Sequence, residues 1–309
     1  MTSATLANPA ALPLPVQTAR PSFVGILRGE FLKVGRQWTT WIMLVLLAGI
    51  MALPMLLDLA RPRLKDELAL NPLAGLYQTM GSDLLVFRVF SGAVLIVITA
   101  RLIGMEYSGG TIRILLSRGV GRLQLLFAKL LTLALIGLAL LVAGLLFDAL
   151  LAVIVLQLIS GNLNALQALN AGFWQDTWLY IQTVMLSMGD AILLATAVTV
   201  LTRSLAAGLS VALVWFPADN IGTIFFYLAY RLTNSTFWLL ITGDLLGPNL
   251  NAMAGLVLPA RATQASFGRA FATPLVPVTA GHTLLVAGVY AAIFLAVAVI
   301  LTARRDVTQ

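Results

Sequence analysis

The loop between residues 103 and 130 carries the residues best suited to binding another protein. It includes Glu106-Tyr107-Ser108-Gly109-Gly110-Thr111-Ile112-Arg113, and Arg118, Arg122 and Lys129 follow before the next apolar run. Each Lys or Arg placed in the hydrocarbon of a membrane costs about 2.5 to 3.5 kcal/mol. This loop must therefore lie outside the membrane core, on one side of it.

The same loop is predicted to present a short helix. Thr111 can cap a helix over residues 112–116, and Gly109 and Gly110 allow the chain to bend before it. The side chains expected to meet a groove in a partner are apolar or charged: Glu106, Ile112, Arg113, Leu115, Leu116 and Arg118. The alternative is a solvated basic loop that only sets the topology, although topology alone requires neither the acidic residue nor the glycines.

Asp190 is the carboxyl group that its position places deepest in a membrane. It lies eleven residues from Leu179, or about 16 Å along a helix. Thr183 and Ser187 precede it at spacings that put all three side chains on one helix face. This polar stripe favours the lining of a transport path or an interface between two subunits. The alternative is a carboxyl group that hydrogen-bonds a neighbouring helix.

Three other charged residues within the apolar runs are expected near the outer boundary of the membrane. Arg88 lies about 6 Å from the outer end of its run, so its guanidinium can reach the headgroups. Asp148 lies near the same boundary and is placed to pair with Arg88. Asp219 follows Pro217, where a helix is distorted, and is expected to face outer water.

The sequence lacks the residue patterns of a catalytic site or a metal site. The chain has no cysteine and one histidine, His282, which excludes disulfides, thiolate sites and multi-histidine metal sites. Asp148, Asp190 and Asp219 are scattered and do not supply the convergent groups of an active site. The phosphate-binding pattern G-x-x-x-x-G-K-[ST] does not occur. We therefore expect no enzyme activity, no metal and no cofactor on this chain itself.

The elements that position these residues are predicted to be membrane-spanning helices. Of the 309 residues, 60% are hydrophobic and 10% are charged, far from the roughly 45–50% and 25% of a soluble domain. Crossing a hydrocarbon core of about 30 Å takes about 20 apolar residues. Six runs approach that length: 41–57, 84–103, 130–158, 179–201, 205–228 and 284–303. The predicted fold class is an all-α polytopic membrane protein.

The distribution of Lys and Arg predicts that both termini are cytoplasmic. With the N-terminus inside, 12 of the 19 Lys and Arg residues fall on the cytoplasmic side and 6 outside, with Arg88 within a span. This is the positive-inside bias of a membrane protein. The net charge of +7 then reflects topology, and no nucleic-acid partner is expected.

The segments flanking the spans have distinct expected roles. Residues 1–21 contain several prolines and no signal-peptide core, which indicates a disordered cytoplasmic tail. Residues 22–38 have apolar groups at helical spacing and carry Glu30, Lys33 and Arg36, so they predict an amphipathic interfacial helix. This helix is either a lipid-anchored leader or a lateral elbow that contacts a partner.

A short hairpin is predicted on the outer face before the last span. Residues 237–246 and 250–258 are apolar runs too short to cross, with Gly247-Pro248-Asn249 between them. No linker or internal repeat divides the chain, so residues 22–309 are expected to form a single domain.

Three segments together resemble the type-two permeases of ATP-binding-cassette (ABC) exporters. The first cytoplasmic loop of that family carries an acidic residue, a Gly-Thr pair, a basic turn and a lysine, which correspond to Glu106, Gly110-Thr111, Arg113, Gly121-Arg122 and Lys129. The other two are Leu27-Arg28-Gly29-Glu30-Phe31-Leu32-Lys33 and Arg304-Arg305-Asp306-Val307. The resemblance spans residues 22–307, and the order of the segments makes it more specific than any one of them.

The resemblance implies a half-transporter with an elbow helix, six spans, a coupling helix after the second span and an outer re-entrant hairpin. Two permease subunits, identical or sister, would pair around a path in the cell membrane. Two separate ATPase subunits would hold ATP and Mg beneath them and drive export. The largely apolar path favours a hydrophobic or amphipathic substrate.

Two other functions remain as alternatives. An ion-coupled secondary transporter would use Asp190 to carry a proton or sodium ion, but the paired Gly/Pro-broken helices typical of such transporters are not found. A membrane-embedded enzyme would need the convergent groups that the sequence lacks.

Overall fold

The computed structural model describes residues 22–265, 267–268 and 272–304, and within these ranges the regular elements are all helices. The prediction of an all-helical membrane protein is confirmed. The expected disordered tail, residues 1–21, and the segment Arg305-Asp306-Val307 lie outside the described residues.

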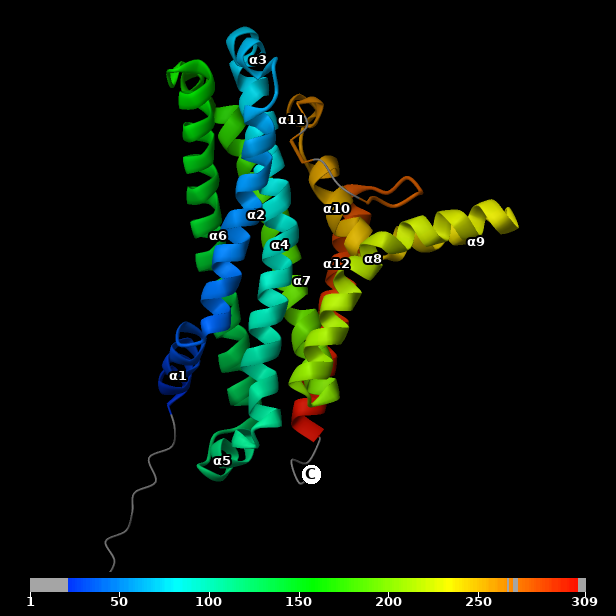
Figure 1. Cartoon of the computed structure of the whole chain (residues 1–309). Helices are drawn as coiled ribbons and strands as arrows, with labels where there is room; N and C mark the ends of the chain where they lie inside the picture. Colours follow the sequence, from blue (N-terminus) through cyan, green and yellow to red (C-terminus); the bar gives the residue numbers. More distant parts are fainter. Residues whose placement is uncertain (1–21, 266, 269–271, 305–309) are drawn as a thin grey trace, which may run out of the picture.

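Five long helices in the described part of the chain are apolar enough to cross a membrane. They are α2 (Trp38–Leu59), α4 (Pro72–Ser108), α6 (Arg122–Ser160), α7 (Ala171–Thr202) and α12 (Ala280–Arg304). They lie side by side in a bundle (Figure 1). In their most apolar stretches, 67% of the residues are buried in α4 and in α7, against 22% in α2 and in α12. The core of the bundle therefore forms around α4 and α7.

Each long helix extends beyond the apolar run that predicted it. The run 84–103, for example, lies within the 37 residues of α4, which measure about 55 Å against a hydrocarbon core of about 30 Å. Polar residues at the helix ends leave the hydrocarbon and do not interrupt the backbone hydrogen bonds. Hydropathy therefore located the crossings but not the ends of the helices.

The run 205–228 lies in a bent helix, and the distortion expected at Pro217 is present. Helix α8 (Leu205–Thr233) bends by 52° between Leu205–Asp219 and Ile221–Thr233. Pro217 lies just before the bend, where its ring removes a backbone hydrogen bond and crowds the preceding turn. The second half of α8 leaves the bundle as an arm (Figure 1). Helix α9 (Phe237–Ile241) packs against this arm, and the rings of Phe226 and Trp238 stack 6.2 Å apart.

The predicted outer hairpin has a different turn. A 3-10 turn, η2 (Thr242–Asp244), follows α9, and α10 begins after the extended residue Leu245 and covers Leu246–Val257. Gly247-Pro248-Asn249 thus lies in the first turn of α10 and not between two runs. Proline is tolerated there because the first N–H groups of a helix have no partner within it. Helix α10 packs against α7, α8 and α12.

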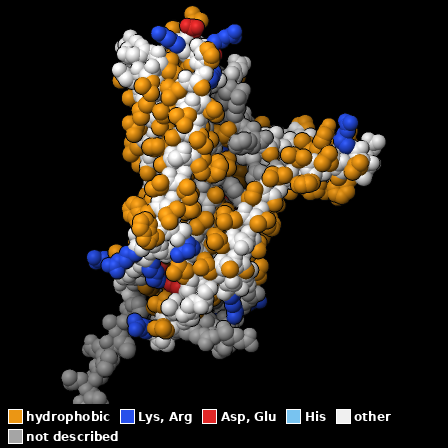
Figure 2. Space-filling model, viewed as in Figure 1, with side chains coloured by type: hydrophobic (Ala, Val, Ile, Leu, Met, Phe, Trp, Pro, Cys, Tyr) orange, Lys and Arg blue, Asp and Glu red, His pale blue; other side chains and the backbone are white. Residues whose placement is uncertain are grey.

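Short helices mark the two ends of the bundle. α1 (Phe23–Gly35), α5 (Thr111–Ser117) and the last turn of α12 lie at one end, and α3 (Leu64–Leu70) and α11 (Ala260–Gln264) lie toward the other (Figure 1). A short 3-10 helix, η1 (Asn164–Ala168), connects α6 to α7. Figure 2 shows Lys and Arg side chains at the two ends of the bundle and at the tip of the arm, with apolar side chains covering the middle of the bundle. Among the described residues, five helices are thus candidate spans, and α8 makes a sixth if its two halves are counted as one span.

Candidate functional site

The short helix α5 projects from the end of the bundle that also holds α1. Gly109 ends α4, and Gly110 adopts a φ of +66°, a left-handed conformation that favours glycine. Gly110 occupies the position before the helix, and Thr111 is its first residue, so Thr111 does not cap the helix as predicted. The chain turns sharply here because a glycine is available at this position.

Helix α5 has an outer and an inner side. Thr111, Ile114, Ser117 and Arg118 are exposed, and Ile114 retains 53% of its surface. Ile112 and Leu116, two of the predicted contact residues, line a cavity of about 130 Å³ between α5 and the ends of α4, α6, α7 and α12. Leu115 is half-buried, and the side chain of Arg113 lies outside the described part of the structure. The accessible apolar contact on this helix is therefore Ile114, which was not among the predicted residues.

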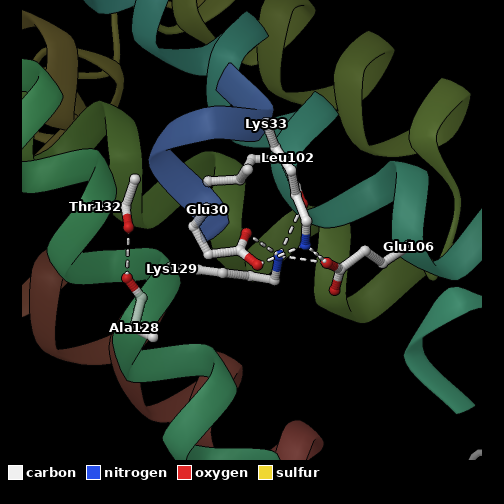
Figure 3. A network of polar contacts seen from close by, with 7 residues as sticks. All are labelled: Glu30, Lys33, Leu102, Glu106, Ala128, Lys129 and Thr132. Carbon is white, nitrogen blue, oxygen red and sulfur yellow. Dashed lines mark hydrogen bonds and ion pairs between the residues drawn. The ribbon is translucent and has the colours of Figure 1, made fainter. Parts of the chain in front are cut away.

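Behind α5 lies a cluster of two carboxylates and two ammonium groups, formed by Glu30, Lys33, Glu106 and Lys129 (Figure 3). We call it the charge cluster. The Nζ of Lys129 lies 2.6 Å from Oε2 of Glu30 and 2.9 Å from Oε1 of Glu106. The Nζ of Lys33 lies 2.6 Å from Oε1 of each glutamate. Lys129 also donates a hydrogen bond to the carbonyl oxygen of Leu102 at 3.1 Å.

Three members of the charge cluster are shielded from solvent. Glu30, Glu106 and Lys129 are 2%, 6% and 3% exposed, whereas the side chain of Lys33 keeps 43% of its surface. Burial lowers the pKa of Lys33, but its hydrogen bonds to Glu106 and Glu30 outweigh that effect and raise the pKa above its ordinary value. The equal numbers of opposite charges make burial tolerable, because an unpaired charge in such a place is very costly.

The charge cluster joins three elements that are distant in the sequence. Glu30 and Lys33 come from α1, Glu106 from the last turn of α4 and Lys129 from the first part of α6. Glu106 immediately precedes the turn into α5. The charge cluster therefore connects the chain just before α5 to α1 and α6 through short, buried ionic contacts.

The beginning of α8 packs closely against the same end of α4. A Cβ atom at Gly104 would lie 2.7 Å from the Cα of Leu205, so the two helices touch through backbone. The Leu205 N–H donates a hydrogen bond of 3.3 Å to Oγ of Ser108. Gly104, two residues before Glu106, is thus in direct contact with α8, the helix that bends just after Pro217.

The predicted site residues therefore separate into different environments. Glu106, Glu30 and Lys33 come together in the charge cluster, where the two glutamates are buried and Lys33 stays partly exposed, so Glu106 does not offer its charge to the surface. Arg36 is exposed and lies outside the charge cluster. Lys129, which the sequence placed at the end of the basic loop, is the more buried of the two lysines in the cluster. The sequence feature that indicates its burial is its position just before an apolar run.

The polar stripe of α7 is also buried. Thr183, Ser187 and Asp190 are 4%, 6% and 2% exposed. The Thr183 hydroxyl donates to the carbonyl oxygen of Tyr180 at 2.7 Å. Ser187 and Asp190 line a small cavity that Asp219 of α8 also reaches, so the structure adds Asp219 to this group. The sequence had placed Asp219 in outer water.

Arg88 is buried and does not reach the headgroups as predicted. It is 2% exposed, and its guanidinium donates to the carbonyl oxygens of Leu250 at 3.1 Å and Asn251 at 3.4 Å, and to Oδ1 of Asn251 at 3.2 Å. It does not pair with Asp148, whose two carboxylate oxygens have no hydrogen-bond partner among the described residues. Arg88 instead ties α4 to the middle of α10.

The end of the bundle opposite α1 and α5 is held by a separate ionic contact that the sequence did not predict. Arg261 in α11 donates two hydrogen bonds to Asp176 of α7, at 2.8 and 2.7 Å, and the hydroxyl of Tyr77 in α4 donates to the same carboxylate at 2.7 Å. The hydrogen bonds to Asp176 raise the pKa of Arg261 above its usual value. Among the described residues no group of three or more His, Cys, Asp or Glu side chains is arranged to hold a metal ion.

Comparison with known proteins gives one family. A family model described as ABC-2 family transporter protein matches residues 26–218, which is more than half of the chain. The match begins within α1 and ends in α8 just before Asp219, so it includes the charge cluster, α5 and the stripe of α7. No curated protein matches the chain.

Proposed function

The chain belongs to the ABC-2 family of transporter proteins, and we propose that it is the membrane-spanning permease subunit of an ATP-driven exporter. The substrate would be hydrophobic or amphipathic, because the spaces inside the bundle are lined mainly by apolar side chains. The ion-coupled alternative with Asp190 as carrier gains no support from the family match.

The observation that carries this proposal is the placement of α5 directly in front of the charge cluster. We propose that α1 is an elbow helix and α5 a coupling helix, and that Thr111, Ile114 and Arg118 contact a groove of an ATPase subunit. A side chain such as Ile114 can supply an apolar anchor at the centre of such a contact. The contact would push or pull α5 when the ATPase subunits close on ATP.

Two routes lead from α5 into the membrane. The first passes from Glu106 through Lys129 and Glu30 into α6 and α1. The second passes from the end of α4 through the Gly104–Leu205 contact into α8, whose bend adjoins Asp219 and, through the hydrogen bond from the Gly247 N–H, α10. Rigid helices joined by buried polar contacts can transmit a displacement over such distances.

The remaining partners follow from the same proposal. Two ATPase subunits, separate from this chain, hold ATP and Mg, and a second permease, identical or sister, completes the path. The end with α1 and α5 faces the cytoplasm of a cell whose plasma membrane holds the bundle. The supporting observation is the excess of Lys and Arg that the sequence assigns to this side.

Purification and reconstitution test the proposal. The tagged chain, extracted in mild detergent, should co-elute with a cytosolic ATPase, and vesicles with both proteins should export an amphipathic dye only with ATP and Mg. Glu106→Ala and Gly110→Pro should leave ATP hydrolysis running while export falls, because α5 no longer moves the bundle. Arg36→Ala, an exposed change outside the charge cluster, is the control. Export without any ATPase would refute the proposal, and coupling that survives both changes would make α5 a mere connector.

A further inference from the structure

Asp190 is a buried acidic residue without a partner. It is 2% exposed on α7, and neither of its carboxylate oxygens has a hydrogen-bond partner among the described residues. Taking a carboxyl group out of water without a hydrogen-bond partner costs free energy, and a charged carboxylate costs far more. A ligand that donates hydrogen bonds to the carboxyl group of Asp190 would remove that cost.

The side chain of Asp190 faces a small cavity together with a second carboxyl group. The cavity measures about 20 Å³ and is also lined by Ser187 of α7 and Asp219 of α8. That volume holds one water-sized group. An Asp219 oxygen accepts the N–H of Gly247 in the first turn of α10, which fixes the orientation of that carboxylate. Two carboxyl groups and a hydroxyl thus converge from two helices.

Larger apolar spaces adjoin this small cavity. A cavity of about 360 Å³ shares Ser187, Gly247 and Leu250 with it. The remaining walls of the larger cavity are mainly apolar, with Val89, Pro217, Ile221, Ile224 and Ala272. A groove of about 470 Å³ along α8 shares Trp215 and Asp219 with the small cavity. The two carboxyl groups therefore lie at the junction between the larger cavity and the groove, both of which are lined mainly by apolar side chains.

Arg88 is the one Lys or Arg residue among the described linings of these three spaces. Its guanidinium is engaged by the carbonyl oxygens of Leu250 and Asn251 and by the side-chain oxygen of Asn251. It therefore serves to hold α10 against α4, and Asp190 is left without an ionic partner among the described residues. The polar centre of the site favours a positive group.

We propose that these spaces bind a cationic amphipathic molecule as the transported substrate. Its ammonium group would lie between Asp190 and Asp219, with Ser187 as a third acceptor, and its hydrocarbon part would occupy the two larger spaces. An ammonium has three N–H donors, which matches two carboxylates and a hydroxyl. An anion of the same shape is rejected by the like charge. This assignment of a substrate class rests on the proposed permease function.

A binding assay tests the site without the ATPase. The purified chain is placed in nanodiscs of zwitterionic lipid, and binding of tritiated dodecylammonium is measured at neutral pH against empty nanodiscs. Unlabelled dodecylammonium should displace the probe, whereas dodecanol and dodecanoate, which have the same chain and a neutral or negative head, should not. Equal displacement by all three would show partition into apolar space and would overturn the proposal.

Three variants locate the binding. Asp190→Asn and Asp219→Asn should each weaken dodecylammonium binding by about tenfold or more, because each removes one charge-assisted contact. Asp148→Asn is the matched control, since Asp148 is equally buried and unpartnered but lines none of the three spaces. It should bind as the unsubstituted chain does.

The possible results separate the two proposals. Wild-type affinity in both Asp190→Asn and Asp219→Asn, or equal loss in all three variants, would refute the cationic site. Saturable binding that depends on Asp190, combined with failure to find an ATPase partner, would refute the exporter proposal and leave the binding site standing. Absence of saturable binding in a chain that does assemble with an ATPase would refute the site alone.

Discussion

Removing the buried ammonium of Lys129 is expected to weaken the attachment of α1 to the bundle. Its Nζ lies 2.6 Å from Glu30, 2.9 Å from Glu106 and 3.1 Å from the carbonyl oxygen of Leu102, and the side chain is 4% exposed. Lys129→Met keeps most of the side-chain volume and removes the charge. Two buried carboxylates then share only Lys33, whose side chain is 43% exposed.

The size of the effect follows from burial. Removing one partner of a buried ion pair costs about 3–5 kcal/mol, because the other charge is left without compensation. At 1.4 kcal/mol per factor of ten, that corresponds to about a hundredfold to a few thousandfold more frequent opening of the contact. Lys33→Met is the comparison, and at a half-exposed position it should cost about 1 kcal/mol or less.

Hydrogen exchange of the amides in Phe23–Gly35 measures this opening, with the protein in nanodiscs. Lys129→Met should accelerate exchange there far more than Lys33→Met. Combining Lys129→Met with Glu30→Gln should recover part of the loss, because the second change removes a stranded charge. Equal effects of Lys129→Met and Lys33→Met, or strict additivity in the double variant, would refute the account of the charge cluster.

Three further changes have expected outcomes. Gly104→Ala places a Cβ 2.7 Å from the Cα of Leu205, so it should cost about 1–3 kcal/mol and lower the Tm in detergent; an unchanged Tm would contradict the close contact of α4 and α8. Gly110→Ala puts a side chain at a φ of +66° and should cost about 1–2 kcal/mol, seen as faster exchange in α5. Gly110→Asn should have a smaller effect, because asparagine tolerates the left-handed conformation better. A larger effect of Gly110→Asn than of Gly110→Ala would contradict the left-handed turn at this position. Arg88→Met removes the hydrogen bonds that join α4 to Leu250 and Asn251 of α10, which should cost about 1–3 kcal/mol and speed exchange in α10; native-like protection there would contradict this role of Arg88.

Hydropathy predicted the crossings of this chain because the cost of placing charges in hydrocarbon is large and local. It did not predict the direction of α8 after its bend. Pro217 signals a distorted helix in the sequence, but where the second half goes depends on packing partners. The turn before α10 was misplaced for a related reason, since Gly247-Pro248-Asn249 suits both a loop and the first turn of a helix.

Long-range polar contacts account for the rest of what the sequence missed. Arg88 was expected to reach the headgroups because depth along a helix does not tell which face a side chain occupies. Its acceptors at Leu250 and Asn251 lie more than 160 residues away. Glu30 and Lys129 are likewise separated by 99 residues. The residues of α5 were found from the sequence, but which of them face outward was decided by the cavity beneath the helix.

The docking of α5 against an ATPase subunit is tested most directly by cross-linking. The chain has no cysteine, so Ile114→Cys introduces a single thiol on the exposed side of α5, and a benzophenone attached there captures whatever it touches. Leu116→Cys, on the inner side, and Leu70→Cys, exposed at the opposite end of the bundle, are the controls. We predict that Ile114→Cys alone captures a protein with the G-x-x-x-x-G-K-[ST] loop, in a yield that changes with ATP and Mg. Capture of that protein through Leu70→Cys and not through Ile114→Cys would contradict the account.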